Sequence, residues 1–233
     1  MTAGTGIVAF NQRLAWLVYR MLMRSGNKVI RARFEPERAD RLVIEADKEF
    51  SRLVPHIPYI GGPRNPFTMT VINAAGTLAL YRSAHQEGMT QEEFKQVFDD
   101  ITEDFMHRYP GWMLRLMGRV WMSPLFRTIM HRSAVKSQKR RYRDDFVFAV
   151  VTKNDMVNDT ANDTANDTAT WGIDYLECGV VKFLHKHDAP QLAKYACSLD
   201  YVMFPAMGVK LQRTATIANG CDRCDFRFSL TSR

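Results

Sequence analysis

Hydrophobic residues recur every three or four positions from the start of the chain, the spacing that places them on one face of an α-helix. The first such series consists of Phe10, Leu14, Leu17 and Met21. We expect this helix to end at residues 26–27, a Gly-Asn pair, because these residue types favour helix termini. The pattern therefore predicts an amphipathic helix near the beginning of the chain.

Three more helices are predicted by the same spacing. The first begins after Glu35 at Pro36 and continues to Pro55, where a loop rich in Pro and Gly follows. The second covers residues 67–88. The third begins at Thr90, which forms a capping-box pattern with the glutamate three positions later. The first part of the chain is thus predicted to be mainly helical.

Residues 111–143 are apolar on one side of a helical projection and basic on the other, and Pro124 must kink this helix or begin a new one. Two interpretations remain open. The stretch can be a helix that packs on the core with a solvated basic face. Alternatively, it forms a surface that meets anionic lipid, an acidic partner or a carboxylate substrate.

The basic charge of the chain is concentrated in this stretch. Residues 111–143 contain no acidic residue and nine basic ones: Arg115, Arg119, Arg127, Arg132, Lys136, Lys139, Arg140, Arg141 and Arg143. Because the total net charge is +7, the rest of the chain carries −2. Such a local concentration does not predict a nucleic-acid-binding domain, and we expect no nucleic-acid partner.

The pattern changes after Arg143 from helical spacing to short, β-branched runs. Residues 144–152 read as a buried strand. Three copies of the tetrapeptide NDTA follow from Asn158, and we expect residues 154–170 to form a flexible surface loop, because these residue types favour turns and exposure. Residues 171–187 read as a strand entering a helix.

Two further elements complete the last third. A helix over 188–208 has Asp188 placed as its cap and a closing glycine. Residues 209–218 and 224–230 then alternate like two strands around the turn-forming pair at 219–220, which predicts a β-hairpin. We therefore expect one α+β domain over 1–233, mainly helical over 1–143, with a small antiparallel sheet and a cysteine-containing pocket over 144–233.

Size and hydropathy place few limits on function. At 233 residues and 46% hydrophobic residues the chain can bury a substantial core. It has no apolar run long enough to predict a transmembrane helix, and its first apolar residues are interrupted too early for a signal peptide. We therefore expect a cytoplasmic protein with reduced thiols. Its oligomeric state is not indicated.

The four cysteines allow several chemistries. Cys221 and Cys224 have a CxxC spacing, but Cys178 and Cys197 lie on other predicted elements, so a four-cysteine zinc site is weakly indicated. A redox CxxC is expected at the start of a helix rather than in a hairpin turn. Two readings remain: buried cysteines that pack as small hydrophobic residues, or a pocket in which a thiol acts as nucleophile or ligand. We predict no metal and no cofactor.

Polar neighbours support the pocket. Asp200 follows Cys197 by three positions, so both lie on one face of the predicted helix. Arg213 lies on the apolar face of its strand, where a guanidinium needs a carboxylate or a ligand. Strand alternation turns Cys224 inward with Phe226 and leaves Cys221 in the turn. A thiol, a carboxylate and a guanidinium can together bind a small anionic molecule.

The order of these residues also carries a family resemblance. Residues 175–228 resemble the L-2-amino-thiazoline-4-carboxylic acid hydrolase family, and residues 73–94 resemble its helical part more loosely. The matching features are Cys178 at the start of a helix, Ala189-Pro190 with Leu192, Cys197 with Asp200, Arg213-Thr214 with Thr216, Gly220, and Cys224-Asp225-Phe226. The order of these cysteines is also similar to that of 4-vinyl reductase domains. Both resemblances imply helices packed on a small antiparallel sheet with a pocket between them.

The resemblance implies a function as well. It implies a hydrolase that opens a small cyclic C–N substrate, such as a thiazoline that becomes an N-carbamoyl cysteine, by thiol- or water-mediated addition. On this reading the catalytic candidates are Cys178, Cys197, Asp200 and Cys224, and the substrate-binding candidates are Arg213, Thr214, Thr216 and Asp225. The alternatives are a non-catalytic small-molecule-binding or sensor domain and a membrane-associated protein that uses residues 111–143.

Overall fold

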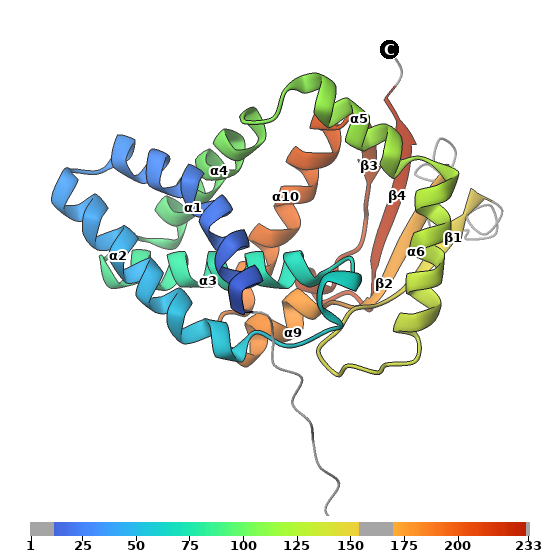
Figure 1. Ribbon diagram of the computed structural model, residues 1–233, viewed down its shortest axis with the longest axis horizontal. Helices are drawn as coiled ribbons and strands as arrows, with labels where there is room; N and C mark the ends of the chain where they lie inside the picture. Colours follow the sequence, from blue (N-terminus) through green and yellow to red (C-terminus); the bar gives the residue numbers. More distant parts are fainter. Residues whose placement is uncertain (1–11, 154–169, 232–233) are drawn as a thin grey trace, which may run out of the picture.

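The structure is a computed structural model that describes residues 12–153 and 170–231. Figure 1 shows most helices in the N-terminal part of the chain and an antiparallel sheet in its C-terminal part. The α+β class predicted from the sequence is therefore confirmed. Phe10 and the NDTA repeats lie outside the described residues.

The first helix, α1 (Gln12–Arg33), is longer than predicted. It continues through Gly26, which is buried against the sulfur of Met23. The residues turned to the core are Val18, Tyr19 and Met23, whereas Leu17 is exposed. Packing against α3 (Thr68–Gln86) and α4 (Gln91–His107) outweighs the weak helix preference of a single glycine, so the predicted end at residues 26–27 is wrong.

The next helices agree better with the pattern. Helix α2 (Pro36–Leu53) begins with its proline in the first turn, as proposed. The capping box of α4 is present: the backbone N–H of Thr90 donates to Glu93 Oε2 (2.8 Å), and the N–H of Glu93 donates to Thr90 Oγ1 (3.2 Å). These contacts satisfy backbone donors that the helix itself leaves unpaired.

The basic stretch forms two helices. Helix α5 (Gly111–Trp121) ends just before Ser123, whose Oγ accepts the backbone N–H of Phe126 (3.2 Å) and caps α6 (Pro124–Ser137). Pro124 thus begins a helix instead of kinking one. None of the helices within the described ranges is long and apolar enough to cross a membrane.

The sheet contains β1 (Val147–Thr152), β2 (Trp171–Glu177), β3 (Val209–Gln212) and β4 (Cys224–Leu230). Its order is β1-β2-β4-β3 and all pairs are antiparallel. The predicted hairpin is the β3–β4 pair, although β3 ends earlier than expected. The register places Tyr175 opposite Cys224 and Ile173 opposite Phe226, so these side chains share one face.

Helices cover this face of the sheet. Helix α10 (Ala193–Ala206) contacts β3, α6 contacts β1, and α9 (Gly179–Lys186) lies between β2 and α10 in the chain and contacts α3 and α10. Figure 1 shows α10 beside the strands and α6 overlapping them in this view. Short 3₁₀ turns occur at Val54–His56, Gly62–Arg64, Pro190–Leu192 and Ile217–Asn219.

The start of the α10 region differs from the prediction. Asp188 has φ +56° and does not cap a helix, because the 3₁₀ turn at Pro190–Leu192 comes first and α10 begins only at Ala193. The predicted end is confirmed: Gly208 follows α10 with φ +73°, a conformation that glycine adopts without strain. Buried residues from the helices and from the sheet form one hydrophobic cluster.

Candidate active site

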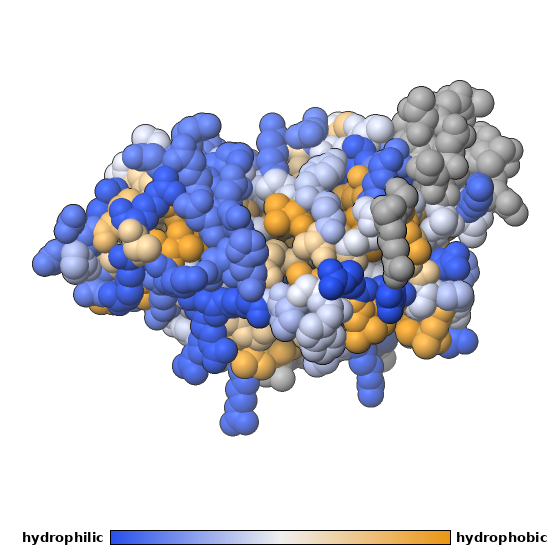
Figure 2. All heavy atoms as spheres, turned by 90° about the horizontal axis from the view of Figure 1, so that it is seen from above, coloured by the Kyte–Doolittle hydropathy of each residue, from blue (hydrophilic) through white to orange (hydrophobic). Residues whose placement is uncertain are grey.

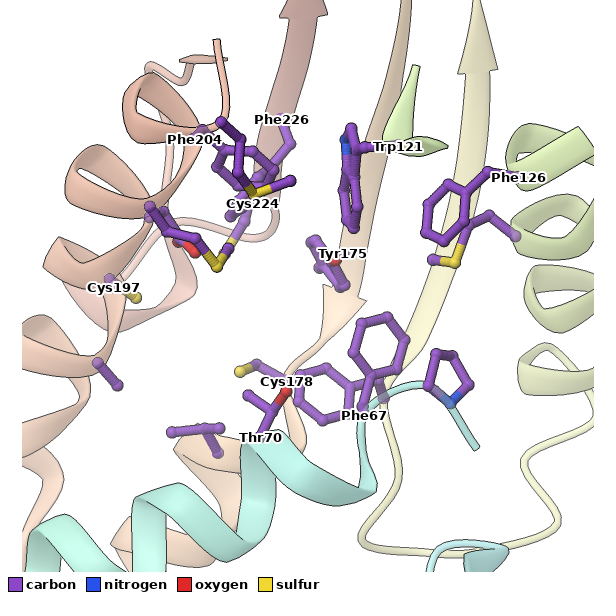
Figure 3. A pocket seen from close by; sticks show the side chains of 18 of the residues that line it. Phe67, Thr70, Trp121, Phe126, Tyr175, Cys178, Cys197, Phe204, Cys224 and Phe226 are labelled. Carbon is purple, nitrogen blue, oxygen red and sulfur yellow. The ribbon is translucent and has the colours of Figure 1, made fainter. Parts of the chain in front are cut away.

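A cavity of about 630 Å³ lies between the sheet and the helices that cover it. Figure 3 shows cysteine and aromatic side chains turned into it from several elements. Its lining is mostly apolar and comes from the start of α3, from α5 and α6, from α9 and α10, and from β2 and β4. The size is typical of cavities that hold small organic ligands.

Four residues that the sequence analysis proposed as catalytic line this cavity: Cys178, Cys197, Asp200 and Cys224. Cys178 occupies the junction between β2 and α9. Cys197 and Asp200 lie one turn apart on α10, and Cys224 reaches the cavity because strand alternation turns it to the same face as Phe226. Four separate positions of the chain therefore converge on one space.

Arg213 lies behind Asp200 and does not line the cavity. Its side chain is only 3% exposed, and its Nη1 donates to Asp200 Oδ2 over 2.7 Å while Nη2 donates to the carbonyl of Cys197 over 3.0 Å. The guanidinium lies between the rings of Tyr201 and Phe226, 4.8 Å from each centroid. Arg213 therefore holds the carboxylate of Asp200 in place.

Asp200 is the ionisable carboxylate of the cavity. Burial raises its pKa to about 6, although the neighbouring Arg213 lowers it. Oδ2 accepts the bond from Arg213, and Oδ1 accepts none from the residues that the structure describes. A carboxyl group with a pKa near neutrality and one free oxygen is suited to transfer protons.

The cavity thiols are predominantly protonated at neutral pH. Burial raises the pKa of Cys178 to about 11, despite the nearby backbone N–H groups of α9, and that of Cys197 to about 12. Burial also raises the pKa of Cys224, whose sulfur accepts the backbone N–H of Ile217 (3.2 Å). Because the thiolate is the nucleophilic form, these cysteines are weak nucleophiles.

The remaining candidates lie outside the cavity. Asp225 accepts the backbone N–H groups of Thr214 (2.9 Å) and Ala215 (2.6 Å) and the hydroxyl of Thr214, and so secures the chain after β3. Thr216 is buried, but it does not line the cavity. Cys221 is exposed in the turn, as its position in the hairpin predicted.

The sequence analysis missed much of the cavity wall. Tyr175, which pairs with Cys224 across the sheet, was detectable from strand alternation, because it shares a face with Trp171 and Ile173. Burial raises the pKa of Tyr175 well above its usual value. Phe67, Thr70, Trp121, Phe126 and Phe204 also line the cavity, and no local pattern connects them with the cysteines.

The described part of the cavity wall offers no cationic side chain. No lysine, arginine or histidine is among the described residues that line it. Likewise, the described ranges contain no group of three or more His, Cys, Asp and Glu side chains that could hold a metal ion. The polar groups that face a ligand are thus Asp200, the thiols and the hydroxyls of Thr70 and Tyr175.

Comparison with known proteins identifies the family. The model of the L-2-amino-thiazoline-4-carboxylic acid hydrolases matches residues 70–228, which contain most of the cavity wall and every catalytic candidate. No curated protein and no solved structure gives a significant match. The matched region covers well over half of the chain. The chain therefore belongs to the L-2-amino-thiazoline-4-carboxylic acid hydrolase family, a family of hydrolases that act on C–N bonds.

Proposed function

We propose that the protein opens a cyclic amidine-like substrate by adding water to its C=N carbon, with Asp200 as the proton-transferring group. The observation that carries this proposal is the position of Asp200: its carboxylate faces an otherwise apolar cavity, with one oxygen held by Arg213 and the other unbonded to any described residue. Family membership supports a thiazoline ring as the substrate's reacting part.

In the proposed reaction Asp200 takes a proton from a water molecule as the water oxygen bonds to the ring carbon. As the adduct forms, the π electron pair of the C=N bond moves to the nitrogen, and it re-forms the C=N bond as the bond between that carbon and the ring sulfur breaks. Asp200 gives its proton to the sulfur, and the remaining hydroxyl proton moves to the nitrogen, which leaves a carbonyl on the carbon and a thiol. One water molecule is therefore consumed for each ring that is opened, and Asp200 returns to its ionised form. Arg213 acts as a positioning residue, because it contacts Asp200 rather than the cavity.

The raised thiol pKa values favour water over cysteine as the nucleophile. A thiol with a pKa of about 11, such as that of Cys178, is ionised at neutral pH in only about one molecule in 10⁴. We therefore assign Cys178, Cys197 and Cys224 to the wall of the cavity, where they contact the substrate. Thr214 and Asp225 bond to each other and so tie the segment after β3, which carries Arg213, to β4, which carries Cys224; we assign them and Thr216 a supporting role outside the cavity.

The test is the hydrolysis of L-2-amino-thiazoline-4-carboxylate, followed by mass spectrometry as the gain of one water molecule. Asp200→Asn should lower kcat by roughly 10²- to 10⁴-fold, the usual contribution of a general base. The matched control is Asp222→Asn, which changes an exposed aspartate in the turn before β4. Full activity of Asp200→Asn would exclude the proposed mechanism.

Serine variants of the cavity cysteines separate the two nucleophiles. Cys178→Ser, Cys197→Ser and Cys224→Ser should each keep kcat within about tenfold of the wild type, with Cys221→Ser as the exposed control. If one of the three cavity variants instead loses all turnover and the wild type accumulates a covalent adduct on that cysteine, the nucleophile is the thiol. Binding without turnover in the wild type would favour a non-catalytic binding domain.

A further inference from the structure

Helix α5 exposes a continuous hydrophobic stripe. Trp112, Leu116 and Val120 follow one another at every fourth position and are 65%, 50% and 53% exposed. Arg115 and Arg119 have the same spacing, are exposed, and lie beside this stripe. Figure 2 shows the molecule from above the view of Figure 1, the side on which α5 lies. Hydrophobic side chains reach the surface in this region, with hydrophilic ones between them.

Helix α6 repeats the arrangement. Leu125, which is 71% exposed, and Ile129 lie one turn apart on its outer face, and Arg132 and Lys136 follow on the same face. Phe126 and Met130 point the other way and line the cavity. Helix α6 therefore contributes one side to the cavity and exposes another that is both hydrophobic and basic.

The basic residues of this face have no acidic partners in the part of the chain that the structure describes. Within the described residues, no ion pair involves Arg115, Arg119, Arg132 or Lys136. Residues 111–143 contain no acidic residue, whereas the rest of the chain has a negative net charge. A partner of this face must therefore supply both negative charge and an apolar layer, and an anionic lipid bilayer supplies both.

The cavity opens onto the same face. Leu116, Met117 and Val120 line the cavity and are also exposed to solvent. These residues therefore form its rim, in line with the stripe that begins at Trp112. A molecule dissolved in a bilayer beneath α5 can enter across this rim without passing through water.

The lining selects against a small anion. It has no described basic side chain, and about 630 Å³ is much more space than one five-membered ring with a carboxylate needs. The wall is rich in aromatic and methionine side chains, among them Trp121, Phe126 and Met130. Such a wall gains free energy by burying an apolar body, while burying an unpaired carboxylate there is costly.

We propose that the exposed faces of α5 and α6 dock on an anionic membrane, and that the cavity takes from it a substrate with an apolar body and a cyclic C–N head. The head meets Asp200, and the body lies against Trp121 and Phe126, whose rings pack on each other with their centroids 4.7 Å apart. The first part is independent of the reaction. The second part rests on the proposed function, since it names the substrate class for the same cavity.

Vesicle flotation tests the docking surface. The full chain should float with phosphatidylcholine vesicles that contain about one-third phosphatidylserine, and much less with phosphatidylcholine alone. Arg115→Gln with Arg119→Gln should lower the partition coefficient by about 25-fold, or about fivefold for each charge. The matched control is Arg20→Gln with Arg24→Gln, an exposed pair with the same spacing on α1.

The hydrophobic stripe has its own control. Trp112→Ser should weaken vesicle binding, whereas Ile44→Ser, which changes an exposed residue of α2, should not. Trp112 does not line the cavity, so its loss leaves the lining unchanged. Absence of flotation, or equal losses in the α1 control pair, would overturn the docking proposal. Binding to polyglutamate but not to vesicles would assign this face to an acidic polypeptide instead.

Two probes test the substrate class: L-2-amino-thiazoline-4-carboxylate and its N-octyl amide, with binding followed by quenching of tryptophan fluorescence and turnover by mass spectrometry. We expect the amide to bind at least tenfold more tightly and to be hydrolysed with a higher kcat/KM. Tighter binding of the free acid would overturn the apolar-substrate proposal. If the amide binds but neither probe is hydrolysed, the proposed reaction fails while the substrate class of the cavity stands.

Discussion

The pKa of Asp200 makes a quantitative prediction for the pH dependence of activity. If Asp200 acts as a base with a pKa of about 6, its ionised fraction is about one-tenth at pH 5 and about nine-tenths at pH 7. The value of kcat/KM should therefore rise about tenfold between these pH values. An aspartate with an ordinary pKa near 3.8 is almost fully ionised at both and would give a nearly flat profile.

The same shift has a consequence for stability. Because the pKa in the folded state is raised, the folded protein binds the proton more tightly than the unfolded chain does. The contribution of Asp200 is therefore most favourable below pH 3.8 and declines as the pH rises towards 6. A shift of about two units corresponds to about 3 kcal/mol, which is the free energy that ionising Asp200 costs the folded state above pH 6.

Carbon-13 NMR of labelled aspartate measures this pKa without a substrate. The resonance that Asp200→Asn removes should titrate near pH 6. In Arg213→Met it should titrate at higher pH, because the guanidinium favours the ionised carboxylate and the thioether can still pack between Tyr201 and Phe226. Titration near pH 4 in the wild type, together with a flat kcat/KM profile, would refute the reasoning.

Three other predictions concern stability and accessibility. Gly118→Ala should lower the free energy of unfolding by about 1–3 kcal/mol in a urea titration, because the new Cβ would lie 2.0 Å from the carbonyl oxygen of Met207. An unchanged midpoint of the titration would contradict this contact. Thr90→Ala should cost about 1 kcal/mol in the same titration through loss of the α4 cap, whereas Thr90→Ser should retain most of it. Ellman's reagent should label Cys221 rapidly and the three cavity cysteines much more slowly, because burial raises their pKa values. Labelling of Cys178 as fast as that of Cys221 would contradict its raised pKa.

Local periodicity was sufficient to predict which way the side chains of Cys197, Asp200 and Cys224 point. Cys197 and Asp200 share a face because they lie three positions apart on one helix, and Cys224 faces inward because residues alternate along a strand. Both relations depend on backbone geometry over a few residues. The hairpin and the cap of α4 were predictable for the same reason.

The partner of Arg213 and the opposite wall of the cavity depend on contacts that no local pattern contains. Arg213 was expected to need either a carboxylate or a ligand and was assigned to substrate binding, and the structure pairs it with Asp200, thirteen positions earlier in the chain. Phe67 and Trp121 reach the cavity from helices that lie far from the cysteines in sequence. The end of α1 was misjudged because α1 packs along its length against α3 and α4, which lie far from it in the chain.

Different parts of the chain supply the polar groups and the apolar wall of the cavity. The set of substrates that fit can therefore change while the polar groups stay the same. The Asp200–Arg213 ion pair and the thiols come from residues 178–224, whereas the rim and much of the apolar wall come from α5 and α6. Substitutions at Leu116, Met117 or Phe126 can thus change which molecules fit while leaving the Asp200–Arg213 pair intact. Libraries restricted to these two helices offer a direct way to redirect the enzyme to other ring compounds.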